Sequence, residues 1–316
     1  MIDLHTHSNC SDGDLSPEEL VEYAYKKKIE VLALTDHDTI SGLERASAHA
    51  QKLGIDFVKG IELGIEWPSG EFHLLGYGIS KVSQSLLDLI ETLQKNREER
   101  NLRIVEKLKE IEVFTSLEEL YEIFNTKNIC RPHIADFLVS KKKVKTRQKA
   151  FDLYLAKGRP IYEKKVGMNL DVAIQAIKDS EGIPVLAHPL SLYVSWGKIE
   201  GVLTDLKERG ICGLEAWHSG VRLSEAKRLE ELARKLGFFV TAGSDFHSRE
   251  TFPCAVPVRQ RWMNGRNMSC ITGQDWPSSR ALPACGRSAA AATSPTSSRW
   301  WNWIRNTSVS GAWDWI

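Results

Sequence analysis

The chain has 316 residues, of which 42% are hydrophobic and 26% charged, and its formal net charge at pH 7 is +1. This length accommodates one large α/β barrel or two ordinary domains, and no apolar run approaches the roughly 18–20 residues that a membrane span requires. The segment from Cys254 onward holds seven Arg and two acidic residues, so residues 1–253 carry 35 basic and 39 acidic side chains. This slightly negative net charge argues against binding to duplex nucleic acid.

Residues 1–80 alternate between strand and helix patterns. The opening M-I-D-L predicts a short strand, and the capping box S-P-E-E at 16–19 predicts a helix that runs to about residue 28. The apolar E-V-L-A-L-T predicts a buried strand, followed by a second capping box, S-G-L-E at 41–44, and a helix that ends near Gly54. The segments 56–67 and 71–79 then predict two strands joined as a hairpin.

Residues 81–165 differ from this pattern, because they are rich in Lys, Glu and Leu at helical spacing. The periodicity predicts a long amphipathic helix at 86–111. Shorter helices are predicted near 117–125, 132–140 and 146–156. We interpret residues 81–165 as a helical insertion that caps a barrel formed by 1–80 and 166–253.

Strand and helix patterns alternate again over residues 166–253. Helices are predicted at 169–180, 198–209 and 223–236, and strands at 183–187, 211–216 and 238–243. The active sites of α/β barrels are built at the carboxyl ends of the strands. We therefore expect the polar side chains that follow these strands to converge.

The segment 254–316 has no comparable pattern. It contains no Lys, seven Arg and seven of the ten Trp residues of the chain, and it shows neither helical nor strand periodicity. Two interpretations stay open, namely translation out of frame or a foreign fusion, and an unusual Trp/Arg-rich appendage. In both cases we expect this tail to lie outside the catalytic fold.

Histidines and carboxylates gather in short motifs, most of which stand where an apolar run ends. The motifs are H-T-H at 5–7, S-D-G at 11–13, T-D-H-D at 35–38, G-I-E at 60–62, H-L-L-G-Y at 73–77, A-H-P at 187–189 and S-D-F-H at 244–247. Burying such groups unpaired is costly, and metal ions are their simplest common partner. One zinc ion takes about three or four protein ligands, so the set predicts two or three divalent ions. The candidate ligands are His5, His7, Asp12, His37, Glu62, His73, His188, Asp245 and His247.

Other polar residues near these motifs have more than one interpretation. Asp3, Asp36 and Asp38 either orient an imidazole or cap backbone amides in a turn. The basic pair Lys164-Lys165 is typical of a solvated face. A Walker phosphate loop and a G-x-S-x-G motif are both missing from the sequence, so we expect a metal-activated water, with no catalytic side chain beyond it. The six scattered cysteines, without C-x-x-C, and the lack of a signal peptide predict a cytoplasmic protein.

Taken in this order, the motifs of residues 1–247 resemble those of the PHP (polymerase and histidinol phosphatase) family. The resemblance implies an α/β fold, a distorted (β/α)7 barrel related to the TIM barrel, with the helical insertion placed as in the stand-alone phosphoesterase branch. It also implies a trinuclear site of manganese, iron or zinc, with Glu62 as a bridging carboxylate. The final strand and helix expected after D-F-H at 245–247 are not recognisable.

The same resemblance implies hydrolysis of phosphate esters. Members of that branch remove the 3′-phosphate from nucleoside 3′,5′-bisphosphates, and some act as 5′→3′ exonucleases on short oligonucleotides. The R-P-H sequence at 131–133 is similar to a family element that contributes to binding of the substrate phosphate, and arginine suits bidentate phosphate recognition. Arg131, His133 and His218 are therefore candidate substrate-binding residues. The alternatives are helix-start side chains for the first two and a packed loop histidine for His218.

We therefore expect a metal-dependent phosphatase that acts on a small phosphorylated substrate, a nucleotide or a short oligonucleotide, with neither duplex nucleic acid nor a membrane as a partner. A phosphatase for another phosphomonoester, such as histidinol phosphate, is the alternative that the family core permits. A non-catalytic PHP module is the third interpretation. The loss of several ligands would be its signature, and all nine ligand positions are filled.

Overall fold

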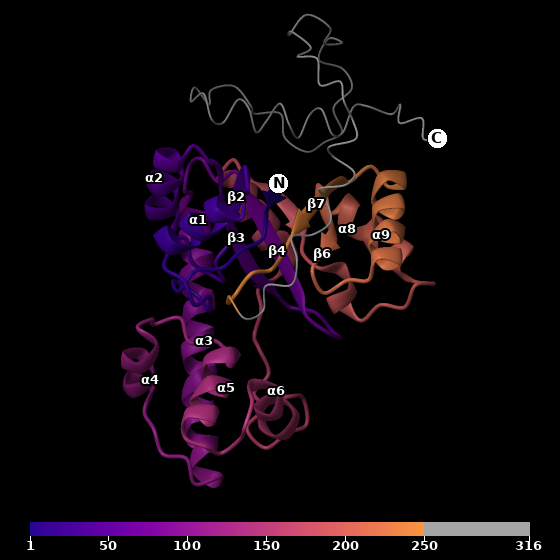
Figure 1. Ribbon diagram of the computed structural model, residues 1–316. Helices are drawn as coiled ribbons and strands as arrows, with labels where there is room; N and C mark the ends of the chain where they lie inside the picture. Colours follow the sequence, from indigo (N-terminus) through magenta and orange to yellow (C-terminus); the bar gives the residue numbers. More distant parts are fainter. Residues whose placement is uncertain (250–316) are drawn as a thin grey trace, which may run out of the picture.

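Seven strands form one sheet that curves into a nearly closed barrel (Figure 1). The structure is a computed structural model that describes residues 1–249, so the predictions for the tail at 254–316 lie outside the described residues. The order of the strands in the sheet follows their order in the chain. The strands are β1 (Ile2–Asp3), β2 (Val31–Leu34), β3 (Asp56–Ile65), β4 (Phe72–Tyr77), β5 (Ile183–Leu186), β6 (Gly213–His218) and β7 (Phe239–Gly243).

One strand, β4, runs against its neighbours. It pairs antiparallel with β3, where Gly64 lies opposite His73, and antiparallel with β5. The other adjacent strands are parallel. The predicted hairpin between the third and fourth strands is confirmed, and so is the predicted distorted (β/α)7 barrel, in which the reversed β4 is the distortion.

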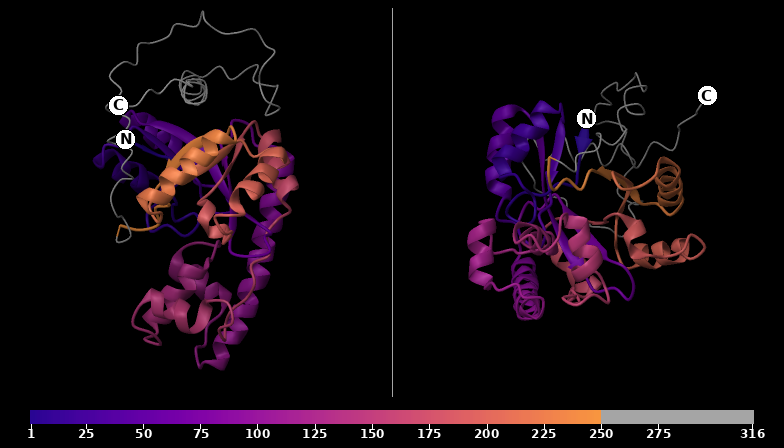
Figure 2. Two further views of the ribbon diagram at one scale, coloured as in Figure 1. Left: turned by 90° about the vertical axis from the view of Figure 1, so that its right-hand side faces the viewer. Right: turned by 60° about the horizontal axis from the view of Figure 1, so that its bottom comes forward.

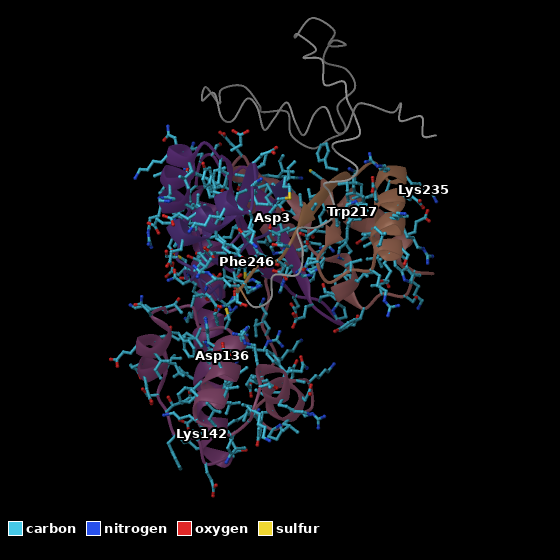
Figure 3. The ribbon with its side chains drawn as sticks, viewed as in Figure 1. Asp3, Asp136, Lys142, Trp217, Lys235 and Phe246 are labelled. Carbon is cyan, nitrogen blue, oxygen red and sulfur yellow. The ribbon has the colours of Figure 1, made fainter. Side chains whose placement is uncertain are left out.

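The barrel closes where β7 returns to β1. The amide of Leu4 donates to the carbonyl oxygen of Ala242 at 3.0 Å, and Thr6 forms a parallel bridge with Phe246 just beyond both strands. Gly243 permits this approach, because a Cβ at that position would collide with the Cβ of His5. Asp3 and Phe246 mark the two closing segments in Figure 3.

Five helices cover the outside of the barrel. They are α1 (Pro17–Lys26), α2 (Leu43–Leu53), α7 (Leu170–Asp179), α8 (Ile199–Glu208) and α9 (Leu223–Lys235). The capping box predicted for α1 is confirmed, since the Ser16 hydroxyl accepts from the Glu19 amide and the Glu19 carboxylate accepts from the Ser16 amide. The second predicted box is wrong. Helix α2 begins one residue later, with Gly42 as its N-cap and no side-chain cap, because the Ser41 hydroxyl is engaged with Thr39.

The segment between β4 and α7 consists of helices that project from one end of the barrel (Figures 1 and 2). Helix α3 (Gln84–Glu110) is shared by two cores. Its first half packs with the barrel through residues such as Leu86 and Leu93, whereas Ile104 and Leu108 belong to a separate apolar cluster. That cluster also receives α4 (Leu117–Phe124), α5 (Arg131–Ser140), α6 (Arg147–Ala150) and the π-helical turn η1 (Phe151–Leu155). The single helix predicted at 146–156 is therefore divided between α6 and η1.

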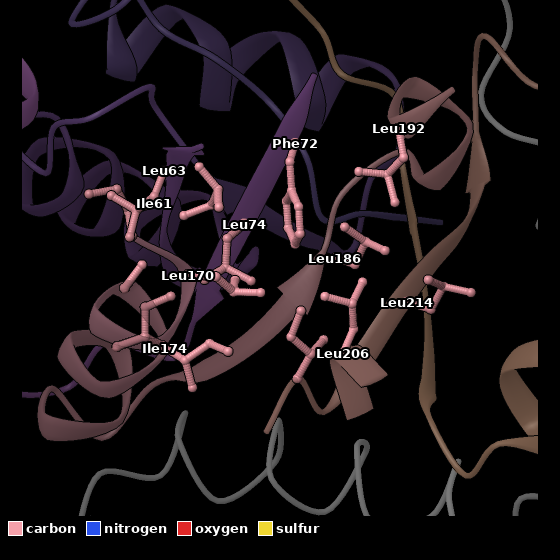
Figure 4. Packing of buried hydrophobic residues seen from close by; sticks show 14 of the residues in the cluster. Ile61, Leu63, Phe72, Leu74, Leu170, Ile174, Leu186, Leu192, Leu206 and Leu214 are labelled. Carbon is pink, nitrogen blue, oxygen red and sulfur yellow. The ribbon is translucent and has the colours of Figure 1, made fainter. Parts of the chain in front are cut away.

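The largest apolar cluster of the described residues lies between the sheet and helices that include α7 and α8 (Figure 4). Phe72 and Leu74 of β4 and Leu186 of β5 meet Leu170 of α7 and Leu206 of α8 there. This packing fixes the strands, and with them the loops that follow their ends. Within residues 1–249, no helix combines the length and the apolar character that crossing a membrane requires.

Candidate metal centre

The structure brings the nine predicted ligands together, and most of them lie beyond the carboxyl ends of strands. His5 and His7 follow β1, His37 follows β2, His188 follows β5, and Asp245 and His247 follow β7, whereas Glu62 and His73 lie within the β3–β4 hairpin. Eight of them form three overlapping groups whose ligand atoms lie within 4.8 Å of one another. The groups are His7, Asp12, His37 and His247; His5, His7, Glu62 and Asp245; and His37, Glu62 and His73. The ninth, His188, contacts Glu62 at 3.2 Å.

Glu62 is at the middle of this arrangement and is fully buried. One carboxylate oxygen lies 2.9 Å from His73 Nδ1, 3.2 Å from His188 Nε2 and 3.3 Å from His5 Nε2. The other lies 2.9 Å from His37 Nδ1 and 3.4 Å from His7 Nε2. Both oxygens of a single carboxylate therefore face imidazole nitrogens.

Asp245 and Asp12 extend the cluster away from Glu62. Asp245 Oδ1 lies 3.0 Å from His7 Nε2 and 3.4 Å from His5 Nε2. Asp12 Oδ1 lies 3.3 Å from His247 Nε2. Three carboxylates thus alternate with the imidazoles, which is the mixture of ligands that zinc, manganese and iron accept.

Several of these buried atoms have no hydrogen-bond partner in the described structure. They are His5 Nε2, His7 Nδ1, Asp12 Oδ1, His37 Nδ1 and Glu62 Oε2. A buried polar atom without a partner costs on the order of 1–3 kcal/mol. These atoms are spread over the three groups, so two or three cations held between them would satisfy them, and the residues fit a metal centre.

The electrostatics of the cluster also favour cations. Burial alone would raise the pKa of Asp12, Glu62 and Asp245, but the adjacent histidines outweigh it and hold the pKa of each carboxyl well below its usual value. Burial lowers the pKa of His7 and His73 to about 4, so both imidazoles are neutral at pH 7. The adjacent carboxylates outweigh burial and raise the pKa of His5, His188 and His247. Because metal binding requires ionised carboxylates and neutral imidazoles, a bound cation would displace the protons from these three rings.

Glu215, within β6, is a residue of the cluster that sequence reasoning missed. It is fully buried, lies 3.0 Å from Nδ1 of His5, and accepts from the backbone amide of His188 at 2.8 Å. A carboxylate on one imidazole nitrogen leaves the other nitrogen directed at the metal. The sequence feature that could have identified Glu215 is its position as the single acidic residue within the otherwise apolar G-L-E-A of that strand.

The sequence left two roles open for Asp3, Asp36 and Asp38, and in the structure all three accept hydrogen bonds from backbone amides. Asp3 accepts from the Ser244 amide at 2.9 Å, and Asp36 accepts from the Ser8 amide at 2.7 Å. Asp38 accepts from the Gly64 amide at 3.1 Å and also forms a buried ion pair with Arg97. These contacts fix the loops that carry the candidate ligands.

The candidate substrate-binding residues lie in three different environments. Arg131 opens α5 and forms an ion pair with Glu71, where its side chain is partly exposed. His133 is buried, and its Nδ1 accepts from the Cys130 amide at 3.0 Å. His218 lies beside the candidate metal centre, with its Nε2 3.5 Å from Asp245 Oδ2.

Lys165 corrects the prediction of a solvated basic pair. Lys164 is exposed, but Lys165 is partly buried, and its Nζ lies 3.2 Å from Nε2 of His73. The lysine side chain crosses Gly64, where a Cβ would lie 2.6 Å from Nζ. The absence of a side chain at Gly64 therefore lets this lysine reach the cluster.

Residues 3–155 match the model of the PHP domain family. A 5′-3′ exoribonuclease from Haemophilus influenzae is 31% identical over 270 residues, which cover 85% of this chain and 94% of the relative. A 3′,5′-nucleoside bisphosphate phosphatase from Chromobacterium violaceum is 31% identical, over 78% of this chain and 87% of the relative. Among solved structures, an amidohydrolase from C. violaceum with bound sulfate and no metal has a TM-score of 0.74 at 31% identity, covering 78% of this chain and 88% of that one.

Proposed function

The chain belongs to the PHP domain family, and on that premise we propose that it is a metal-dependent phosphoesterase that hydrolyses a phosphate ester of a nucleotide-like substrate. The substrate class is a nucleoside 3′,5′-bisphosphate or a short oligonucleotide, in line with the names of the two relatives. The observation that carries the proposal is Glu62, whose buried carboxylate is contacted by five imidazoles. A cluster of this kind has more ligand atoms than one ion needs.

The nine candidate ligands would hold two or three divalent ions of manganese, iron or zinc, with Glu62 as the bridging carboxylate. When bound, such ions supply Lewis-acid activation of water and of the phosphoryl group. Glu215 keeps the His5 ring in the orientation that directs Nε2 toward Glu62. Asp36 and Asp3 hold the loops after β1 and β7 in place, so the ligand geometry is set before the substrate arrives.

Arg131 and His133 at the start of α5, together with His218, would bind the substrate. The Arg131 guanidinium presents a planar fork that suits a phosphate. It is paired with Glu71, so the incoming phosphate would take over part of that contact. His218 would face the substrate from the side of Asp245.

The test joins metal analysis with phosphate release. The full chain is purified anaerobically, its metal content is measured, and it is assayed on nucleoside 3′,5′-bisphosphates, nucleoside monophosphates, a short oligonucleotide and histidinol phosphate. We expect more than one equivalent of metal and the fastest turnover on the nucleotide substrates. The variant Glu62→Gln should lose metal and activity together. The control variant His49→Ala should retain both, because His49 lies on α2 and pairs with the exposed Glu22.

Three results would contradict the proposal. They are a metal-free protein after anaerobic purification, a Glu62→Gln variant with full activity, and turnover confined to histidinol phosphate.

A further inference from the structure

The second half of the helical insertion, residues 127–165, carries a large excess of positive charge and is called the basic segment below. It contains twelve basic and three acidic side chains. Over residues 1–253 as a whole, acidic side chains outnumber basic ones by 39 to 35, so the remainder of that region is strongly acidic. Positive charge concentrated in one part of a fold attracts anionic ligands to that part.

Both ends of the basic segment lie at the candidate metal centre. Near its start, Asn128 Nδ2 donates to the carbonyl oxygen of His37 at 2.6 Å. At its end, Nζ of Lys165 lies 3.2 Å from Nε2 of His73. Arg131, the candidate phosphate-binding residue, opens α5 between these two points. A chain of phosphates that leaves the metal centre on this side would therefore meet the basic segment.

Helix α6 also begins close to the metal centre. Its first residue, Arg147, donates to both carboxylate oxygens of Asp136. This hydrogen-bonded pair raises the pKa of Arg147, and the charges of Asp14 and Asp12 raise it further. Because Asp12 is a candidate metal ligand, the start of α6 and the metal centre lie within electrostatic reach of each other.

Exposed cations continue along the rest of the segment. Helix α5 has ten residues and so spans about 15 Å, and Figure 3 shows Lys142 beyond it, at the end of the insertion farther from the barrel. Among the described residues, several exposed basic side chains of the segment have no carboxylate within ion-pair distance. They are Lys127, Lys142, Lys145, Lys157, Arg159 and Lys164, which together are called the basic surface.

The extent of the basic surface suits a polymer of phosphates. A small anion needs one or two cations, whereas these cations are distributed over helices that project from the barrel (Figure 1). A stacked strand rises about 3.4 Å per nucleotide, so roughly four nucleotides would cover the length of α5. Proteins that bind single strands without sequence preference use positively charged surfaces that follow the backbone.

We propose that the basic surface binds the part of a single-stranded oligonucleotide that extends beyond the scissile phosphate, and so makes the enzyme prefer oligonucleotides over mononucleotides. That this strand is a substrate rests on the proposed function. Binding of the strand does not, because the basic surface contacts phosphates that lie away from the metal centre.

The experiment compares two triple variants of the full chain. The test variant combines Lys142→Gln, Lys145→Gln and Arg159→Gln. The matched control combines Lys26→Gln, Lys28→Gln and Lys52→Gln. The control removes the same charge from α1, α2 and the turn after α1, where these lysines are exposed and have no carboxylate of the described residues within ion-pair distance. Lys28 and Lys142 also share a positive φ, of 60° and 59°, so both variants alter one residue of this conformation.

Turnover and binding are measured separately. The value of kcat/KM is determined on a nucleoside 3′,5′-bisphosphate and on oligonucleotides of increasing length, at about 50 and about 200 mM salt. Binding is followed by fluorescence anisotropy of a labelled RNA whose phosphorothioate linkages resist hydrolysis. Unlabelled RNA, an RNA duplex and a polyglutamate peptide serve as competitors.

We expect kcat/KM of the wild type to rise with oligonucleotide length up to about four or five nucleotides. The test variant should lose this rise and keep its turnover of the bisphosphate. Each phosphate contact of a single strand contributes about −0.7 to the slope of log K against log salt, so three lost contacts should lower the slope by about 2. Between about 50 and about 200 mM salt, the RNA affinity of the test variant should therefore fall roughly 20-fold less than that of the wild type. The control should match the wild type.

The possible failures are distinguishable. If no nucleotide is hydrolysed but RNA binding depends on the basic surface, the proposed function is wrong and the basic surface stands as a site for single strands. If the wild type does not bind the RNA, or if the test variant keeps the length dependence and the salt slope of the wild type, the basic surface is only a solvated face and strand binding is refuted. Equal losses in the test and control variants would also refute it, since net charge alone would then explain the binding. Stronger competition by the duplex or by polyglutamate than by unlabelled RNA would assign the surface to another partner and overturn the proposal.

Discussion

The buried ion pair between Asp38 and Arg97 should contribute measurably to stability, and Asp38→Asn isolates that contribution. Asp38 is 1% exposed and has a positive φ of 52°, a backbone conformation that asparagine also tolerates. Asparagine retains an oxygen for the Gly64 amide. The substitution therefore removes the charge, and it also replaces the oxygen that accepts from Arg97 with an amide donor.

The magnitude follows from the pKa of Asp38. Burial raises this pKa, but Arg97 and Lys165 outweigh burial and lower it from 3.8 to about 2. At 1.36 kcal/mol per pKa unit, the ionised carboxylate contributes on the order of 2 kcal/mol to the free energy of unfolding. Because the pKa is depressed in the folded state, this stabilisation is fully present above pH 4 and is lost as the pH falls from about 4 to about 2.

The assay is urea unfolding of the wild type and Asp38→Asn in the presence of a chelator, at a series of pH values from 7 to 2.5. We expect a deficit of about 2–4 kcal/mol in the variant at pH 7, with the upper end reflecting the charge left on Arg97. The deficit should shrink below pH 4. The matched control is Asp171→Asn, which breaks the exposed pair with Arg209 and should cost less than about 1 kcal/mol. A pH-independent deficit in Asp38→Asn would refute the electrostatic explanation.

Three further variants test the surroundings of the metal centre. Glu215→Gln should weaken metal binding by about 10- to 100-fold, because it removes the charge that orients His5, and metal titration would show whether affinity is instead unchanged. Gly243→Ala should cost about 1–3 kcal/mol by overpacking against His5 where β7 meets β1, and an unaltered melting temperature would contradict this. Arg131→Ala should raise KM about tenfold or more while the metal content stays constant, and a loss of metal would place Arg131 among the metal-site residues instead.

Periodicity predicted most of the barrel because each strand and helix is a local pattern. The strand at 31–35 and the helix at 86–111 appear as Val31–Leu34 and Gln84–Glu110. The motifs predicted the ligand positions for the same reason. A histidine that directly follows a strand is placed in space by the end of that strand. Asp12 is the exception among the ligands, because it lies in a loop and does not directly follow a strand. Ser8 and Ser11 hold this loop through hydrogen bonds to Asp36, and the motif spacing did not predict those contacts.

Long-range contacts account for what the sequence did not predict. Glu215 contacts a histidine 210 residues away in the chain. Lys165 reaches His73, 92 residues away, only because Gly64 has no side chain. The burial of Arg100 was equally hard to predict, because an arginine on an amphipathic helix normally faces solvent.

The contacts that close the barrel and those that form the metal centre involve the same residues. The carbonyl oxygen of His5 accepts a hydrogen bond from the Asp245 amide. The imidazole ring of His5 contacts the carboxylates of Asp245, Glu62 and Glu215. His188 has a positive φ of 24°, a conformation that side chains rarely adopt and that persists where surrounding contacts over-determine it. A cation in the cluster would compensate both this strain and the crowded carboxylates, since a ligand that binds only the folded state stabilises it. The junction of β1 with β7 is therefore the part of the barrel whose stability should depend most on metal.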